Sequence, residues 1–242
     1  MGSDLRTLGL IGGINWQGTR EYYRLINEGV NRELGGHHSA KLIMHSVDFG
    51  EIIRYIQKNN WDAIAQQLVD AARGLERAGA EGLMICNGMM HKVADIVASA
   101  INIPLVHGVD CVGEAMQHHD HRRIGLLSNE ITMMGEFYYS HLEQKFGLEI
   151  IIPDKSQRLE IDRIISDVLC HGNYPNQERE TFLSIINSLR SRGAESVVIA
   201  CTEIARLVQQ PMTPVPLYES APIHCAAAVN FLLNRTAKRA AA

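Results

Sequence analysis

The chain has 242 residues, of which 46% are hydrophobic and 21% charged, and its formal net charge is −4. This balance is typical of a globular protein with a sizeable core, and no basic cluster interleaved with aromatic residues suggests a nucleic-acid partner. There is no signal peptide and no apolar run long enough to span a bilayer, and the five cysteines form no disulfide pattern, so we expect a cytoplasmic protein with reduced thiols and no membrane partner.

The first predicted elements are a strand, a glycine-rich turn and a helix from Arg20 to Leu34. The turn lacks the G-x-G-x-x-G order of dinucleotide-binding loops, so a dinucleotide is not expected. Backbone amides of such a turn can approach a small anion such as a carboxylate. We therefore take Gly13, Asn15 and Gln17 as candidate substrate-binding residues.

The first half continues with a predicted strand from Lys41 to Val47 and an amphipathic helix from Trp61 to Ala78. A short apolar strand then ends in Cys86-Asn87-Gly88, and His91 follows. In open α/β sheets, ligands bind beyond the carboxyl ends of the strands. His91 is either an acid/base group or a residue that caps the next helix.

The second half repeats this pattern. A strand near residues 122–127 leads to Ser128-Asn129, and the following segments predict a helix over 132–146, a strand over 149–152 and helices over 156–169 and 180–192. The run from His118 to His121 lies in a polar loop, and neighbouring residues cannot converge on one ion, so we expect no metal site.

Cys201 follows the strongest strand signal in the chain, the β-branched run Val197-Val198-Ile199. Helical spacing resumes at Thr202, so we expect Cys201 at a helix N-terminus, where the thiol pKa is lowered and the thiolate favoured. The alternative is a buried cysteine with a packing role only.

Matched segments indicate an internal duplication. Gly9 corresponds to Gly125, an offset of 116; Gly79 corresponds to Gly193, an offset of 114; and Pro104 corresponds to Pro216, an offset of 112. We predict two homologous, doubly wound α/β lobes with parallel sheets, related by pseudo-twofold symmetry, with the active site in the cleft between them. The predicted boundaries are 5–112 plus 214–235 for the first lobe and 113–213 for the second, with tails at 1–4 and 236–242. In this register Asn87 pairs with Cys201, and Cys86 with Ala200.

The last predicted loop runs from Tyr218 to His224 and should overhang the cleft. His224 there is a candidate partner for the Cys201 thiol or for a substrate carboxylate. The other interpretation is a histidine that opens the terminal helix.

Six segments resemble the aspartate/glutamate racemase family, the cofactor-independent amino-acid racemases, and together they cover nearly the whole chain. They are Gly9-Leu10-Ile11-Gly12-Gly13-Ile14-Asn15-Trp16, Tyr22-Tyr23-Arg24-Leu25-Ile26-Asn27, His38-Ser39-Ala40, Ser46-Val47-Asp48-Phe49, His91-Lys92-Val93-Ala94-Asp95 and Ala200-Cys201-Thr202-Glu203-Ile204. The resemblance implies two α/β lobes, a homodimer, no cofactor, and two opposed residues that remove and return the α-proton of an amino acid. Cys201 looks like one of the two, with Thr202 and Glu203 beside the substrate.

The other catalytic motif departs from the family pattern. The family has cysteine or threonine where this chain has Asn87, and an amide side chain cannot abstract a proton. Cys86 would restore the motif only if the register shifted by one residue, because in an unshifted strand it points to the opposite face.

Substrate recognition also departs from the pattern. Glu160 replaces a lysine that some relatives use to hold the substrate's side-chain carboxylate, and it would favour a neutral or cationic side chain. The loop that carries Ser128, Asn129 and Thr132, which we expect to contact substrate together with Gly88, is altered as well.

Three functions stay open: an amino-acid racemase or epimerase that is not aspartate-specific, a one-thiol decarboxylase or isomerase of the same superfamily, and a binding protein without turnover. The racemase would need no pyridoxal phosphate, since no lysine lies at a predicted strand end to form a Schiff base, and we expect no cofactor.

Overall fold

The computed structural model describes residues 5–235, and the predicted tails at 1–4 and 236–242 lie outside the described residues. The chain divides into two compact units: one comprises the chain up to Gly108 and from His224 onward, and the other comprises Val109–Ile223. Each unit is an α/β structure built on a parallel sheet, as predicted.

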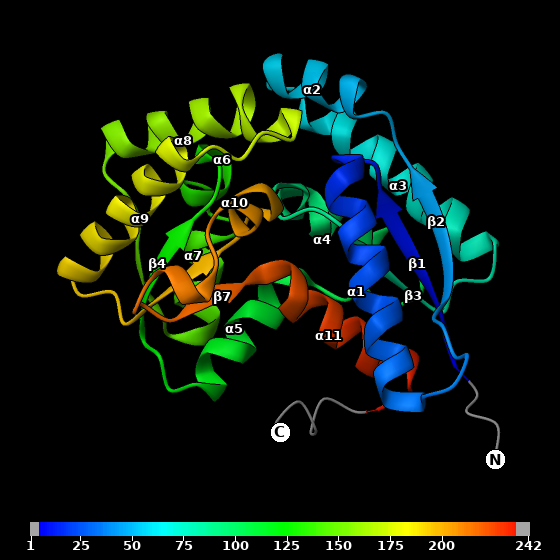
Figure 1. Cartoon of the computed structure of the whole chain (residues 1–242). Coiled ribbons are helices and arrows are strands. Elements are labelled where there is room, and N and C mark those ends of the chain that lie inside the picture. Colours follow the sequence, from blue (N-terminus) through cyan, green and yellow to red (C-terminus); the bar gives the residue numbers. More distant parts are fainter. Residues whose placement is uncertain (1–4, 236–242) are drawn as a thin grey trace. The chain divides into compact units, whose positions relative to one another are not determined.

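The first unit contains a sheet of strand order β2-β1-β3, and an isolated parallel bridge joins Leu83 to Leu105 beside it. Helix α3 packs against this sheet on one face, and α1 lies on the other with α11 (Figure 1). The elements are β1 (Thr7–Gly12), α1 (Trp16–Leu34), β2 (Lys41–Ser46), α2 (Phe49–Gln57), α3 (Trp61–Arg77), β3 (Gly82–Ile85), a 3-10 helix (Met89–Val93) and α4 (Ala94–Ser99).

Strand alternation explains the two covered faces of this sheet. Ile11 of β1 joins the core formed with α3, whereas Leu8 and Leu10 point to the opposite face, and all three side chains are fully buried. A strand whose two faces are both buried has a continuous apolar sequence, which is the pattern seen here.

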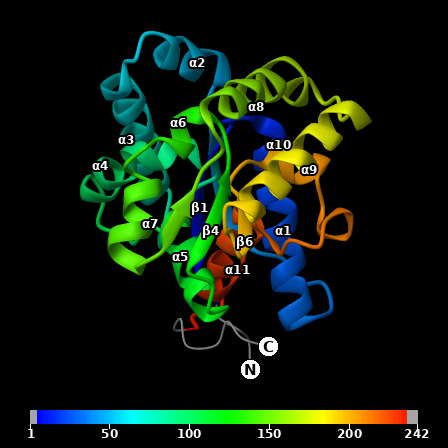
Figure 2. The same cartoon turned by 90° about the vertical axis from the view of Figure 1, so that its left-hand side faces the viewer.

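The second unit has a sheet of strand order β5-β4-β6-β7, and Figure 2 labels its two central strands, β4 and β6. Helix α9 packs on β4 and β6, and a single apolar core joins the sheet to its helices. The elements are α5 (Gly108–His118), β4 (Arg123–Leu127), α6 (Glu130–Met133), α7 (Tyr139–Phe146), β5 (Glu149–Ile151), α8 (Lys155–Asp167), a 3-10 helix (Leu169–His171), α9 (Asn176–Ser191), β6 (Ser196–Ile199), α10 (Thr202–Leu207), a 3-10 helix (Gln210–Met212), β7 (Leu217–Glu219) and α11 (Ser220–Leu232), which continues into the first unit.

The two units repeat the same hydrogen bonds at the predicted offsets, which confirms two homologous halves. The Leu83 amide donates to the Pro104 carbonyl, and the Val197 amide donates to the Pro216 carbonyl. A hydrogen bond from a glutamate side chain to the backbone is repeated as well. The carboxylate of Glu81 accepts the Thr7 amide, and the carboxylate of Glu195 accepts the Arg123 amide.

One predicted helix is wrong in its extent. The helix expected over 132–146 is two helices, α6 and α7, because the chain turns between Met133 and Tyr139. Gly135 lies in this turn, and its carbonyl accepts the amides of Tyr138 and Tyr139. Glycine has a weak helix propensity, and the turn lets the Tyr138 ring enter the core, where it is 2% exposed.

The C-terminal part of the chain also differs from the sequence interpretation. Residues 214–235 are predicted to join the first lobe, but β7 pairs with β6 and therefore belongs to the sheet of the second unit. The loop expected over 218–224 is instead the end of β7 and the first turn of α11.

Within residues 5–235, no helix has both the length and the apolar character needed to cross a membrane.

Candidate functional site

Most of the predicted site residues lie at the carboxyl ends of parallel strands. In the second unit, β4 and β6 are neighbours, and Leu127 pairs with Ile199. The loops that follow the two strands are joined by a hydrogen bond from the Ser128 hydroxyl to the Ala200 carbonyl, 2.9 Å. The segment that starts at Ser128 therefore lies directly beside Cys201.

Cys201 is the N-cap residue of α10, with extended backbone angles. Its Sγ donates to Oε2 of Glu203 at 3.2 Å, and the Thr202 hydroxyl donates to the same oxygen at 3.0 Å. One carboxylate thus accepts from both the thiol and its neighbour.

The expected lowering of the Cys201 pKa is wrong in direction. Burial raises the pKa of the thiol well above its ordinary value, and the charge of Glu203 raises it further. Backbone amides of Ile204 and Glu203 at the start of α10 act in the predicted direction, but they are outweighed. The surroundings of Cys201 therefore favour the protonated thiol over the thiolate.

The loop after β4 is a small, ordered structure. Asn129 caps α6, with Oδ1 accepting the Thr132 amide at 3.0 Å. Thr132 and Ser128 are fully buried, and the Thr132 hydroxyl has no hydrogen-bond partner among the described residues. A buried hydroxyl without a partner is unusual.

Glu160 does not lie at a strand end. It is on α8, paired with Arg163, and this pairing lowers the pKa of its carboxyl. The side chain lines an open surface groove of about 480 Å³ together with residues of α8 and α9, namely Ser156, Gln157, Glu180, Thr181, Ser184 and Ile185.

In the turn after β1 in the first unit, several polar groups are hydrogen-bonded to one another and to the start of α1. The Gly13 amide donates to the Thr19 hydroxyl at 2.9 Å, and Asn15 caps α1 by accepting the Gly18 amide at 2.8 Å. Gln17 is half-buried in the first turn of α1. The Gly13 amide therefore has a protein partner rather than an open position for an anion.

Asn87 holds the turn after β3. Its amide nitrogen donates to the Ile14 carbonyl, and its Oδ1 accepts the Met90 amide at 3.1 Å. Cys86 is 2% exposed, and burial raises the pKa of its thiol strongly. Gly88 is half-buried, and its carbonyl accepts the His91 amide.

His91 uses both ring nitrogens on backbone groups. Nδ1 donates to the Asn87 carbonyl and Nε2 accepts the Gly108 amide, both at 2.9 Å. This fixes one neutral tautomer, and burial lowers the pKa of the ring well below its usual value. The contacts of the ring hold the turn after β3, and His91 does not cap the next helix, because the N-cap residue of α4 is Val93 and no side chain caps it.

His224 is similarly enclosed. It is 1% exposed, its Nε2 donates to the Val106 carbonyl at 2.8 Å, and the Tyr22 hydroxyl lies 3.5 Å from Nδ1. Burial lowers the pKa of His224 to about 4. These contacts support packing in the first unit rather than contact with substrate.

Sequence reasoning missed residues that flank the Cys201 segment. Arg206 of α10 stacks over the Tyr174 ring, with Cζ 4.9 Å from the ring centroid. Burial raises the pKa of the Tyr174 hydroxyl; the charge of Arg206 acts against this, and Glu203, Cys170 and Cys201 add smaller raising contributions. No spacing pattern links residue 174 to residue 201, so no sequence signal could have identified this neighbour.

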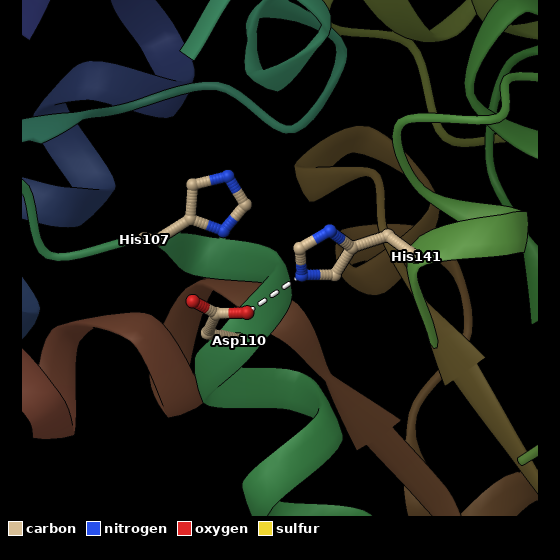
Figure 3. A group of neighbouring side chains, drawn as sticks. All are labelled: His107, Asp110 and His141. Carbon is tan, nitrogen blue, oxygen red and sulfur yellow. Dashed lines mark hydrogen bonds and ion pairs between the residues drawn. The ribbon is translucent and has the colours of Figure 1, made fainter. Parts of the chain in front are cut away.

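A second polar cluster was also missed. Asp110 of α5 accepts hydrogen bonds at Oδ1 from His141 Nε2 at 2.6 Å (Figure 3) and from Lys145 Nζ at 2.7 Å. Both partners lie on α7, and the ammonium group already supplies a positive charge to this carboxylate. The cluster joins two helices of the second unit.

Comparisons with known proteins give one matching family and several relatives. Residues 11–228 match the family model described as Asp/Glu/Hydantoin racemase. A Yersinia pestis structure assigned as an Asp/Glu racemase is 40% identical and superposes with a TM-score of 0.90, covering 95% of this chain and 100% of its own.

Two further relatives are more distant. An aspartate racemase homologue from Pyrococcus horikoshii OT3 is 31% identical, with a TM-score of 0.81 over 96% of this chain and 100% of that chain. The broad specificity amino-acid racemase RacX of Bacillus subtilis (strain 168) is 20% identical over 161 residues, which are 66% of this chain and 68% of RacX.

Proposed function

Because this chain belongs to the Asp/Glu/hydantoin racemase family, we propose that it is a cofactor-independent racemase or epimerase that moves the α-proton of an amino acid, with Cys201 as an acid/base group. The observation that carries the proposal is the Cys201 thiol at the end of β6, hydrogen-bonded to the carboxylate of Glu203. A thiol beside a carboxylate can lose and regain a proton during turnover.

In the proposed mechanism, Glu203 accepts the proton of the resting thiol, and the thiolate then removes the α-proton of the substrate. Thr202 supports this step, since its hydroxyl donates to the same carboxylate oxygen and so orients it. In the opposite direction of the reaction, the protonated thiol donates a proton to one face of the substrate carbanion, and the raised pKa of Cys201 suits this role. Inversion also requires a second group on the other face, and the test below asks whether Cys86 is that group.

The substrate carboxylate is proposed to lie against the loop after β4. The buried Thr132 hydroxyl, without a partner in the described part of the chain, supports this placement. Ser128 and Asn129 shape the loop, and Gly13, Asn15, Gln17 and Gly88 remain proposed contacts of the first unit. The cleft between the units, the homodimer and the cytoplasmic location also remain proposals.

A neutral or cationic substrate side chain remains a proposal from the sequence alone, because Glu160 pairs with Arg163 and lines the groove of α8 and α9 rather than the loops beside Cys201.

A second candidate is a one-thiol decarboxylase or isomerase, and Asn87 favours it. The Asn87 side chain cannot titrate, and both of its polar atoms bind the backbone of neighbouring turns. Cys86 is buried, with a raised thiol pKa, so it is poorly placed to serve as the second acid/base. One thiol can protonate a carbanion after loss of carbon dioxide without a second base.

The test is proton NMR in deuterated buffer with a panel of L- and D-amino acids. Cys201→Ala is the inactive control, and Cys86→Ala asks whether the buried thiol takes part. Exchange with inversion that is lost in Cys201→Ala supports the racemase. If Cys86→Ala also loses inversion, Cys86 is the second acid/base group of the racemase.

Exchange without inversion in the parent would favour the one-thiol candidate, and malonate-type diacids, which leave a carbanion when they lose carbon dioxide, should then be tested for release of carbon dioxide. No exchange with any amino acid would overturn the racemase proposal. Binding that persists in Cys201→Ala without turnover of any compound would indicate a binding protein.

A further inference from the structure

The loop after β4 is held from outside by helix α8. The Glu130 amide, at the first position of α6, donates to Oδ1 of Asp162 at 2.7 Å, and the two residues are 32 positions apart in the sequence. The first amides of a helix have no partner inside it, so a side chain from another element is needed to satisfy them. Asp162 supplies that partner.

Arg158 adds a second contact from the same helix. It lies one turn before Asp162, its Nε is 3.4 Å from Oε1 of Glu130, and its Nη1 donates to the Pro153 carbonyl at 2.9 Å. The Arg158 side chain is only 13% exposed. Helix α8 therefore holds both the backbone and the side chain of Glu130.

This contact lies close to the thiol. On one side of Glu130, Ser128 is bonded to the carbonyl of Ala200, the residue before Cys201. On the other side, Thr132 carries the buried hydroxyl without a described partner. A loop fixed at Glu130 has few ways to move either of these groups.

We propose that Asp162 is a positioning residue for the reaction: by accepting the Glu130 amide it sets the loop 128–132 that holds the substrate carboxylate beside Cys201. The inference rests on the proposed function, since it assumes that this loop contacts substrate. Residues that fix a binding loop without touching the substrate commonly affect rates by on the order of tenfold to a hundredfold.

The first variants are Asp162→Ala, which removes the acceptor, and Asp162→Asn, which keeps an acceptor oxygen of the same shape. Asp167→Ala, an exposed carboxylate at the end of α8, is the matched control. A complementary variant removes the donor: Glu130→Pro deletes the amide at a helix position where proline is well accepted, and Glu130→Ala controls for loss of the side chain.

Two readouts are needed. One is the α-proton exchange rate, separated into kcat and KM. The other is independent of turnover: the ratio of alkylation rates of Cys201 by iodoacetate and iodoacetamide, followed by peptide mass spectrometry. Both reagents form a sulfur–carbon bond and release iodide, but only iodoacetate carries the carboxylate that the loop is proposed to hold.

We expect Asp162→Ala and Glu130→Pro to lose the preference for iodoacetate and to lower kcat/KM about tenfold or more. Asp162→Asn and Asp167→Ala should stay within about twofold of the parent in both readouts, and Glu130→Ala, which keeps the amide but loses the Arg158 contact, should lose clearly less than Glu130→Pro. If Asp162→Ala does not fold, the Glu130→Pro and Glu130→Ala pair carries the test.

The inference is overturned if Glu130→Pro keeps the parental kcat/KM and the parental preference for iodoacetate. It is also overturned if Asp162→Asn is as impaired as Asp162→Ala, or if the parent itself shows no preference for iodoacetate. A parent that shows the preference but exchanges no α-proton would contradict the racemase proposal alone, and the alkylation ratios would still decide the role of Asp162.

Discussion

At the scale of single residues, the protonation state of Cys201 is decided by its neighbours rather than by its position on a helix. The amides at the start of α10 favour the thiolate, yet burial and the Glu203 carboxylate together favour the thiol. A six-residue helix offers a weak dipole, whereas a carboxylate at hydrogen-bond distance acts at full charge.

Glu203→Gln should therefore lower the Cys201 pKa, because the variant removes the neighbouring negative charge. The pH at which alkylation of Cys201 by iodoacetamide reaches half its maximal rate should move to a lower pH, and the rate near pH 8 should rise. Glu180→Gln, on α9, is the control and should leave the profile unchanged. A midpoint that stays in place or moves upward would contradict the proposed coupling.

At the scale of an element, the turn from β1 to α1 depends on the absence of a side chain at Gly13. This residue has a φ of +91°, and a Cβ built there would lie 2.2 Å from the Val47 carbonyl oxygen. Its amide also donates to Thr19, so the backbone cannot rotate freely to escape the clash.

Gly13→Ala should consequently reduce the free energy of unfolding by about 3 kcal/mol or more. Gly36→Ala is the matched control, because Gly36 also has a positive φ, +57°, but no atom lies within 4 Å of the position that a Cβ would take there. The control should lose only about 1 kcal/mol, the cost of the backbone conformation alone. Urea unfolding of the two variants measures the difference, and equal losses would refute the steric explanation.

At the scale of the whole molecule, each unit is stabilised by its own core, and the first unit buries two histidines in the neutral form. His91 and His224 hold the segment that ends at Gly108, where a Cβ would lie 2.9 Å from one ring and 3.0 Å from the other. In each ring one nitrogen faces a hydrogen-bond donor. If the ring gained a proton, that nitrogen would become a donor as well, and the hydrogen bond from the facing donor would be lost.

Stability should therefore fall in mild acid. The folded pKa of His224 is lowered to about 4 from 6.5, so the unfolded chain binds more protons between these values. The stabilisation is complete above about pH 6.5 and is lost as the pH falls through about 4, by up to roughly 3 kcal/mol.

His224→Gln should flatten this dependence, because the amide can still donate to the Val106 carbonyl but does not titrate. Thermal unfolding between pH 7 and pH 4 measures the slope, with His37→Gln, an exposed position, as the control. Parallel slopes for His224→Gln and the parent would show that His224 does not contribute.

Much of this architecture could be predicted from the sequence because the relevant signals are local or repeated. The apolar runs before Gly12 and Cys201, the helical pattern of α3 and the matched segments of the two halves all follow from residue order, and the strands lie where these patterns predict them. Cys201 is identified by the strand that precedes it.

Other features were decided only by the tertiary structure. The helix over 132–146 is divided so that Tyr138 can enter the core. The pKa of the Cys201 thiol is raised because burial and Glu203 outweigh the helix start, and the Glu130 amide is bound by Asp162 from a different helix. Periodicity and turn chemistry depend on neighbours in the chain and so survive in the sequence, whereas burial, charge and hydrogen-bond partners depend on residues tens of positions away that only folding brings together.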